Sequence, residues 1–485
     1  MSTDAQVCIG GKWFDGGLGS YEIINPATEE VVGNAPNCSV EQSIAATEAA
    51  AEAFESWSRT SPEERANLLE KAADLYDQRK DEFAPLVQAE TGATMRVAKT
   101  MQVPQVSARF RRYARGAMEP TIIPLQPAVT ATTALAPGGL MSAAVNRAPV
   151  GVVSCITSYN FPVVNMAGKI GPALAMGNTV IVKPAPQDPL AVIKLVEVMN
   201  EAGFPPGVIN VMCGTDIPAS EALVSSPHVD MVSFTGSTGV GRRIGSVAGG
   251  EMKRLLLELG GKGACIVFDD ADLKAAIGGI SSVWAFHSGQ ICTAPTRVIV
   301  QRGVYEHLVA GLTQAAGALK VGDPVERDTV VGPVITDVHR GRIEGYIQSA
   351  RDEGAHIAVG GERPDFDKGF YVAPTLIAEA NNQMTAVREE IFGPVVVVVP
   401  FDDDEEAVTL ANATEFGLYD YVFSADTNRA MAVAKRIRSG NVGINTAQRN
   451  HDAAFGGFKM SGVGRDGGSW GLHAYSEMQS IIWPG

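Results

Sequence analysis

The stretch MVSFTGSTGVGRRIGSV, residues 231–247, decides the fold expected for this chain of 485 residues. Its first six residues are typical of a buried strand, a turn of Gly, Ser and Thr follows, and a helix is expected over 239–248. Similar runs precede it at 151–158, 179–184 and 208–214, with helical stretches between them. This alternation predicts a parallel sheet with right-handed crossovers, which binds ligands at the carboxyl ends of its strands.

A second alternation begins after residue 260. Apolar runs predict strands at 297–302, 355–359, 394–401, 420–424 and 441–445. Helical spacing predicts helices at 271–288, 304–319, 338–353, 404–414 and 427–438. The expected fold class is therefore α/β, with two parallel-sheet cores.

Helices are also expected before the first sheet, over 40–57, from 62 toward 91, and over 94–115. The apolar face predicted for the first of them contains Ile44, Ala45, Ala49, Ala53, Phe54 and Trp57. Residues 121–147 instead alternate small, Thr and apolar residues around a Pro-Gly-Gly turn, which predicts a long hairpin. A lone ribbon is marginal in water, so it needs a surface to pack on, such as another subunit. The final run YSEMQSIIWP is expected to add a strand.

Composition excludes several classes of protein. The formal net charge is −15 and no segment is rich in Lys and Arg, so neither nucleic acid nor an anionic membrane surface is an expected partner. The N-terminal stretch MSTDAQVCIGGKWFDGG is not a secretory signal, and no apolar run has the length of a membrane helix. The six cysteines have no CxxC spacing and no adjacent His, so we expect no disulfide, no metal site and a cytoplasmic location.

Two segments carry candidate cofactor chemistry. The turn after Phe234 contains Gly236 and Ser237 in the order GxxGxG, where small residues and a helix N-terminus favour a phosphate. The alternative is a tight turn without a ligand, since the order differs from the usual dinucleotide fingerprint. Lys183 ends a predicted strand and suits a ribose or phosphate, unless it is an ordinary surface lysine.

Two residues are candidates for covalent and acid–base chemistry. Cys292 follows a predicted helix, where a buried structural cysteine is the alternative to a nucleophile. Glu258 lies within an apolar run, and burial there would raise its pKa and suit it to act as a base. The alternative for Glu258 is a salt-bridged acid in the core.

Five short motifs occur together in the chain. They are YNFP at 159–162, ELGGK at 258–262, GQIC at 289–292, EIFGPV at 390–395 and FGGFKMSG at 455–462. With these motifs in this order, the whole chain resembles the aldehyde dehydrogenase superfamily, in its NAD(P)-dependent hydrolytic form. The resemblance implies a Rossmann-like cofactor domain and a catalytic domain.

The resemblance also implies roles for individual residues. Cys292 is expected to attack the aldehyde, and the Asn160 amide and the Cys292 backbone N–H to bind the oxyanion. Glu258 is expected to activate the water that hydrolyses the thioester, and Lys169 to support the region of Asn160. In the cofactor site, Lys183 would hold the adenosine ribose, and the turn from Phe234 through Gly236 to Ser237 the pyrophosphate. Glu390 would hold the nicotinamide ribose with Phe392 beside it.

Two positions depart from the family pattern. Pro186 stands where many relatives have a Glu that binds both ribose hydroxyls, which leaves NADP open although we expect NAD. Gly168 stands where many relatives have Trp, which predicts a roomy tunnel for a bulky or long aldehyde unless a neighbour fills the space. The expected tunnel residues are Phe161, Val164, Asn165, Gly168, Ile291, Thr293, Arg449 and Phe455. Arg449 and His451 are candidates to contact a polar or carboxylate-bearing substrate, or are solvated loop residues.

The resemblance finally implies a domain plan and an oligomer. Residues 1–120 and 148–259 form the expected dinucleotide-binding domain, 260–445 the catalytic domain, and 121–147 with 466–485 an oligomerisation ribbon of a homodimer or homotetramer. Three other functions compete with hydrolytic oxidation: a CoA-acylating relative, a catalytically silent structural member and an esterase. A CoA-acylating relative is expected to lack Glu258, and a silent member to lack Cys292, Glu258 or Asn160. An esterase does not need a cofactor site.

Overall fold

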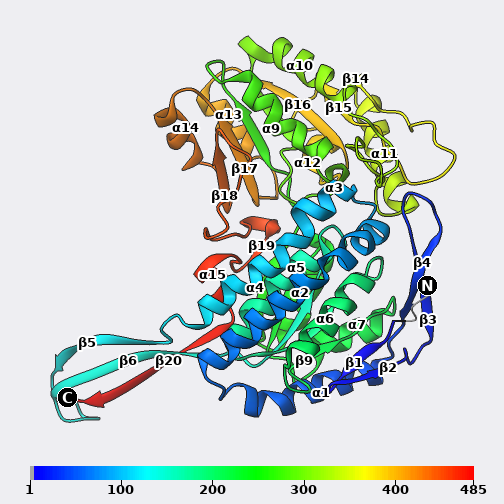
Figure 1. Cartoon of the computed structure of the whole chain (residues 1–485). Coiled ribbons are helices and arrows are strands. Elements are labelled where there is room, and N and C mark those ends of the chain that lie inside the picture. Colours follow the sequence, from blue (N-terminus) through cyan, green and yellow to red (C-terminus); the bar gives the residue numbers. More distant parts are fainter. Residues whose placement is uncertain (1–4) are drawn as a thin grey trace.

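Two large sheets organise residues 5–485, the part of the chain that the computed structural model describes (Figure 1). The first sheet has eight strands in the order β19-β11-β10-β7-β8-β9-β1-β2, and its inner five strands are parallel. Its strands are β1 (Val7–Ile9), β2 (Lys12–Phe14), β7 (Val152–Ile156), β8 (Thr179–Lys183), β9 (Ile209–Val211), β10 (Met231–Thr235), β11 (Arg254–Glu258) and β19 (Gly462–Val463). The four strands expected between 151 and 236 are confirmed, whereas β11 was not foreseen.

Helices cover both faces of this sheet. One face packs against α1 (Val40–Trp57), α7 (Ile217–Ser225) and α8 (Thr238–Gly250). The other packs against α2 (Pro62–Thr91), α4 (Val103–Ala117), α5 (Pro162–Ala175) and α6 (Leu190–Ala202). The helix expected over 94–115 is α3 (Met95–Val97) followed by a π-helical turn and α4.

The bounds of α1 agree with the sequence prediction, but of its predicted apolar face only Trp57 is fully buried. The buried residues of α1 are Ser43, Ala46, Thr47, Ala50 and Trp57, whereas Ile44 is 43% exposed. The helix is rich in Ala, and small residues let it approach the sheet closely along a face that also contains Ser and Thr.

The second sheet has seven strands in the order β14-β15-β16-β13-β12-β17-β18, all parallel except the edge strand β14. They are β12 (Ala264–Val267), β13 (Arg297–Gln301), β14 (His356–Val359), β15 (Thr375–Ala378), β16 (Val395–Phe401), β17 (Tyr419–Phe423) and β18 (Asn441–Ile444). One face is covered by α9 (Leu273–Ala285) and α10 (Tyr305–Gly317), and the other by α11 (Asp337–Asp352), α12 (Thr385–Arg388), α13 (Asp404–Asn412) and α14 (Thr427–Ala434).

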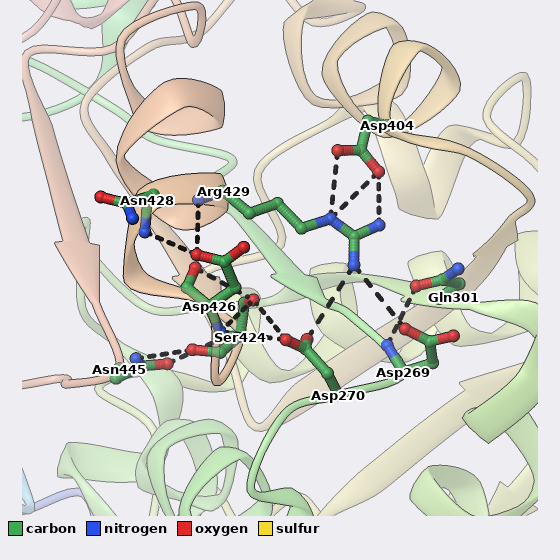
Figure 2. Close-up of polar contacts among 9 residues, drawn as sticks. All are labelled: Asp269, Asp270, Gln301, Asp404, Ser424, Asp426, Asn428, Arg429 and Asn445. Carbon is green, nitrogen blue, oxygen red and sulfur yellow. Dashed lines mark hydrogen bonds and ion pairs between the residues drawn. The ribbon is translucent and has the colours of Figure 1, made fainter.

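An arginine on α14 ties three segments of this second unit together (Figure 2). The Arg429 guanidinium donates to Asp404 at the start of α13 and pairs with Asp269 just after β12. It also lies over the Phe268 ring, 3.8 Å from its centroid. These contacts fix α13 and α14 against the end of β12.

A three-stranded ribbon projects from the body of the molecule (Figure 1). It consists of β5 (Ile122–Thr130), β6 (Gly139–Pro149) and β20 (Ser476–Pro484), with β6 in the middle. The expected hairpin and the expected final strand are thus confirmed, and every residue of β5 is exposed. The N-terminal region adds the pair β3 (Ser20–Ile24) and β4 (Val31–Pro36), and α15 (Gly468–His473) precedes β20.

Three observations concern the sequence-based exclusions. Nowhere in residues 5–485 is there a helix both long and apolar enough to cross a membrane. The six cysteines are free thiols. In the same described residues, no three His, Cys, Asp or Glu side chains are grouped so that they could hold a metal ion. The N-terminal stretch weighed as a signal lies partly outside the described residues.

Candidate active site

The carboxyl edge of the first sheet collects the predicted site residues. Lys183 is the last residue of β8 and Glu258 the last of β11, while Asn160 follows β7 and Ser237 follows β10. Parallel pairing aligns Thr235 with Glu258, so the Gly-Ser turn and the carboxylate lie side by side. Parallel strands therefore bring together residues from four distant segments.

Cys292 arrives from the second unit on a strained turn. His287, Ser288 and Gly289 have φ angles of 47°, 53° and 75°, three left-handed residues in succession. A Cβ at position 289 would lie 2.1 Å from the Gly393 carbonyl oxygen, so only glycine fits. Ser288 Oγ donates to the Gly332 carbonyl at 2.7 Å, which holds the turn in place.

One cavity of about 380 Å³ joins these groups. Cys292, Glu258 and Asn160 line it together. The other predicted site residues on its wall are Phe161, Asn165, Gly236, Ser237, Ile291, Thr293, Glu390, Phe392, Arg449 and Phe455. The sequence had assigned them to catalysis, cofactor and tunnel, and one inner cavity contains all of them.

Asn160 is positioned beside the cysteine by two hydrogen bonds. Its Nδ2 donates to the Gln290 carbonyl at 2.8 Å, and its Oδ1 accepts from Ser158 Oγ at 2.8 Å. An amide nitrogen has two hydrogens, so one N–H remains for a ligand in the cavity. The Cys292 backbone N–H lies beside its own sulfur.

Glu258 and Cys292 both retain their protons beyond the usual pH range. Burial raises the pKa of Glu258 well above its ordinary value, and the charge of Asp466 raises it further. Burial also raises the pKa of the Cys292 thiol to about 12, opposed by the positive charge of Arg449. Neither oxygen of Glu258 has a hydrogen-bond partner within residues 5–485. An unpartnered carboxylate facing a cavity is free to bind water.

Glu390 and Phe392 form the other end of the inner cavity. Glu390 accepts from the Gly261 N–H at 2.8 Å, and a Cβ on Gly260 would lie 2.4 Å from its Oε2. The Phe392 carbonyl and His339 Nε2 are 2.8 Å apart, and the Tyr159 ring meets the Phe392 ring edge-on. Burial raises the pKa of Glu390 to about 7.

A second pocket of about 500 Å³ continues from the first. The predicted cofactor residues Lys183, Pro186 and Phe234 line it, and Gly236 and Ser237 line both pockets. The N-terminus of α8 begins at this junction, where Ser237 is the N-cap. A two-headed ligand with a phosphate in its middle fits this pair of connected pockets.

Three predicted residues do not reach either pocket, which corrects their assignment. Val164 is buried in the core between α5 and the first sheet. Lys169 is buried too, and its Nζ donates to Ser233 Oγ at 3.0 Å rather than to Asn160. Gly168 opens no space, because a Cβ there would lie 2.0 Å from Arg109 Nη1. The inference of a roomy tunnel at Gly168 is therefore wrong, since an arginine from α4 fills that volume.

Sequence reasoning also missed cavity residues. Arg109, Asp466, His339 and Arg342 line the inner cavity, and Glu221 and Arg243 line the second pocket. A signal for the first existed: Arg109 lies three residues after Val106 and four before Tyr113, both buried. A charged side chain next to the apolar face of a helix indicates that it lies close to the core, so Arg109 was a candidate site residue.

A dinucleotide-type pocket that leads to a cysteine, a buried carboxylate and a free amide N–H is typical of oxidoreductases with a covalent thiol intermediate. Comparison with known proteins identifies the family. The model of the aldehyde dehydrogenase family matches residues 13–481. The chain belongs to that family and is an aldehyde dehydrogenase.

Its relatives differ in their substrates. The chain is 38% identical to geranial dehydrogenase of Castellaniella defragrans, over 99% of both proteins. It is 37% identical to the mitochondrial succinate-semialdehyde dehydrogenase of Oryza sativa subsp. japonica, over 98% of this chain and 89% of that protein. A solved structure of betaine aldehyde dehydrogenase from Staphylococcus aureus in complex with NAD+ matches with a TM-score of 0.93 and 34% identity, over 99% of this chain and 95% of that one.

Proposed function

We propose that this enzyme oxidises an aldehyde to the carboxylate with NAD+, through a thiohemiacetal and a thioester on Cys292. The observation that carries the proposal is the shared cavity of Cys292, Glu258 and Asn160 at the junction with the dinucleotide-type pocket. NAD+ supplies a hydride acceptor when bound. Lys183 and the α8 N-terminus would hold its adenosine half, and Glu390 its nicotinamide ribose.

The residues divide the reaction into two steps. The Cys292 sulfur attacks the aldehyde carbon, and the free N–H of Asn160 with the Cys292 backbone N–H stabilises the oxyanion that forms. After hydride departs, a thioester remains on Cys292. Glu258 then takes a proton from a water molecule, whose oxygen attacks the thioester carbon; the C–S bond breaks, the carboxylate product is released and Cys292 is restored as a thiolate.

The second pocket supports NAD+ over NADP+. Position 186 is a proline, but Glu221 on α7 lines the same pocket and pairs with Arg243 on α8. Glu221 can therefore replace the carboxylate that many relatives have at position 186. The Glu221 carboxylate would repel a 2′-phosphate that approached Arg243.

The proposed activity is tested with the purified full chain. Incubated with NAD+ and a simple aldehyde, it should produce NADH and one equivalent of carboxylate, measured by near-ultraviolet absorbance and product analysis. The same assay with NADP+ should give a lower kcat/KM. Absence of NADH with every aliphatic, aromatic and terpenoid aldehyde tested would refute the proposal.

The pH dependence follows from the two raised pKa values. Cys292 and Glu258 act only without their protons, and both retain them to higher pH than usual. We expect kcat/KM for a neutral aldehyde to rise from mildly acidic to alkaline pH, together with the rate of Cys292 alkylation by iodoacetamide. A profile that peaks at acidic pH would contradict this assignment.

We propose further that the ribbon joins protomers into a homodimer or homotetramer. The exposed apolar side chains on it include Ile122, Leu125, Val129, Leu140, Met478, Ile482 and Trp483. Exposed apolar area of this kind marks a protein interface. We also propose a division into a dinucleotide-binding domain, a catalytic domain and this ribbon. We propose a cytoplasmic location, which the six free thiols support.

Charged substitution on the ribbon tests the assembly. Ile482→Lys combined with Val129→Lys should lower the mass measured by size-exclusion chromatography with light scattering, because two charges would be buried in the interface. Met252→Lys, at an exposed apolar residue outside the ribbon, should leave the mass unchanged. A monomeric wild-type protein would disprove the proposed assembly.

A further inference from the structure

Arg109 places a guanidinium without an ion-pair partner in the substrate cavity. It lies on α4, is partly buried, and occupies the space that a side chain at Gly168 would fill. Across residues 5–485, none of the ion pairs or hydrogen bonds that the structure contains involves its side chain. Its neighbour Arg112 differs, because it pairs with Asp452.

Arg449 places a second guanidinium in the same cavity. It belongs to the loop between β18 and Phe455, and its guanidinium lies 3.9 Å from the centroid of the Phe455 ring. The described residues contain no carboxylate in ion-pair contact with it. A stacked guanidinium keeps its in-plane N–H donors free for an anion.

Both arginines lie between Cys292 and the outside. Each lines the inner cavity with Cys292 and also an outer cavity of about 680 Å³, and Phe455 and Asp466 do the same. Asp466 is the single acidic residue on both walls, and one of its oxygens accepts from the Gly467 N–H at 2.6 Å. The residues that line both cavities therefore carry two positive charges and one negative charge, whereas Glu258, Glu390 and Arg342 line the inner cavity but not the outer one.

An uncharged aldehyde chain would suit this passage poorly. It would remove water from two guanidinium groups and give them no acceptor in return, which costs more than the apolar contact gains. A carboxylate satisfies them with charge-assisted hydrogen bonds in a planar geometry. We propose that Arg109 and Arg449 bind the carboxylate of the substrate, and that the enzyme prefers short aldehydes with a carboxylate at the other end.

The preferred chain is short because the inner cavity is small. Its volume is about 380 Å³, and part of this space lies beside Glu390 and Phe392, where the nicotinamide would bind. Because Cys292 and both arginines line this one cavity, we expect the aldehyde carbon and the carboxylate of the preferred substrate to be separated by only a few carbons. This inference rests on the proposed oxidation of an aldehyde by Cys292.

The test compares 4-oxobutanoate with its methyl ester, which has the same chain without the charge. With wild-type enzyme and NAD+, kcat/KM for the acid should exceed that for the ester by about 100-fold, the range for a charge-assisted contact. Arg109→Gln should lower kcat/KM for the acid by about 10- to 100-fold through KM, and change that for the ester by less than about threefold. Arg449→Gln should lower kcat/KM for the acid by a larger factor than for the ester, whose rate also falls because the Arg449 charge opposes the raised pKa of Cys292. Activity on the ester also shows that each variant is folded.

Two further variants separate the geometry from the charge. Gly168→Ala places a methyl group where Arg109 Nη1 lies, so it should reduce the preference for the acid while both arginines remain. Arg96→Gln removes an exposed arginine from α3 outside both cavities and should leave the preference unchanged. Equal kcat/KM for acid and ester in the wild type would overturn the inference but not the proposed function. No turnover of either compound, or of any other aldehyde, would overturn both.

Discussion

Cys292→Ala should abolish NAD+ reduction with every aldehyde. The cavity contains no other thiol, and alanine cannot form the covalent adduct from which hydride departs. Steady-state NADH production should fall by at least about 10⁴-fold, the scale of a lost nucleophile. The variant should still bind NAD+, because the dinucleotide-type pocket is intact. Titration with NAD+ should therefore change its tryptophan fluorescence as it does in the wild type. Retention of turnover would show that another residue is the nucleophile.

Cys265→Ala is the matched control for the loss of a thiol. Cys265 lies in β12, is fully buried, and contacts neither pocket. Its replacement leaves a small cavity in the second core, with a cost of about 1 kcal/mol in the free energy of unfolding. We expect turnover close to wild type with a slightly lower melting temperature, so the two variants separate chemistry from stability.

Glu258→Gln should separate the two halves of the reaction. Glutamine cannot take the proton from water, so the thioester should accumulate after a single burst of NADH, and steady-state turnover should fall by about 10²–10⁴-fold. Rapid-mixing absorbance measures the burst, and mass spectrometry of the quenched enzyme measures the acyl adduct. An unchanged steady state would remove Glu258 as the base.

The same variant distinguishes the competing functions. A CoA-acylating enzyme would release the thioester to CoA, so added CoA would restore turnover in Glu258→Gln. An esterase would hydrolyse esters without NAD+ at a rate comparable to aldehyde oxidation. Glu90→Gln is the control for burial: Glu90 is a buried carboxylate with a pKa raised to about 8 by burial, and its oxygens accept from the first N–H groups of α6. It should lower stability without producing a burst.

The sequence predicted the elements whose hydrophobic pattern is unambiguous. The four strands between 151 and 236 and the helices that join them are in the structure because Val- and Ile-rich runs alternate with helical spacing. The strands β11, β12 and β15 escaped prediction, because each adjoins another strand in the chain with no helix between them and so lies outside the strand–helix alternation. Of the predicted face of α1 only Trp57 is fully buried, because alanines on every side of this helix provide no contrast.

The site was predictable where a motif defines it and not where packing does. Cys292, Glu258 and Asn160 lie in motifs and were found. The missing side chain at Gly168 was visible in the sequence, but the neighbour that fills its volume comes from a different helix. The predicted tunnel was roomy, whereas the structure has Arg109 in the volume beside Gly168, because α4 packs against α5 there.

The left-handed turn before Cys292 has a practical consequence for protein engineering. The left-handed conformation costs on the order of 1–3 kcal/mol at each of the non-glycine residues His287 and Ser288. The Gly289 backbone and the Ser288 hydrogen bond depend on two other segments of the chain. The nucleophile therefore sits on a part of the protein that random mutagenesis will rarely improve. Arg109 and Arg449 do not hold this turn in place. Mutant libraries aimed at new substrates should therefore vary those two positions and leave residues 287–292 unchanged.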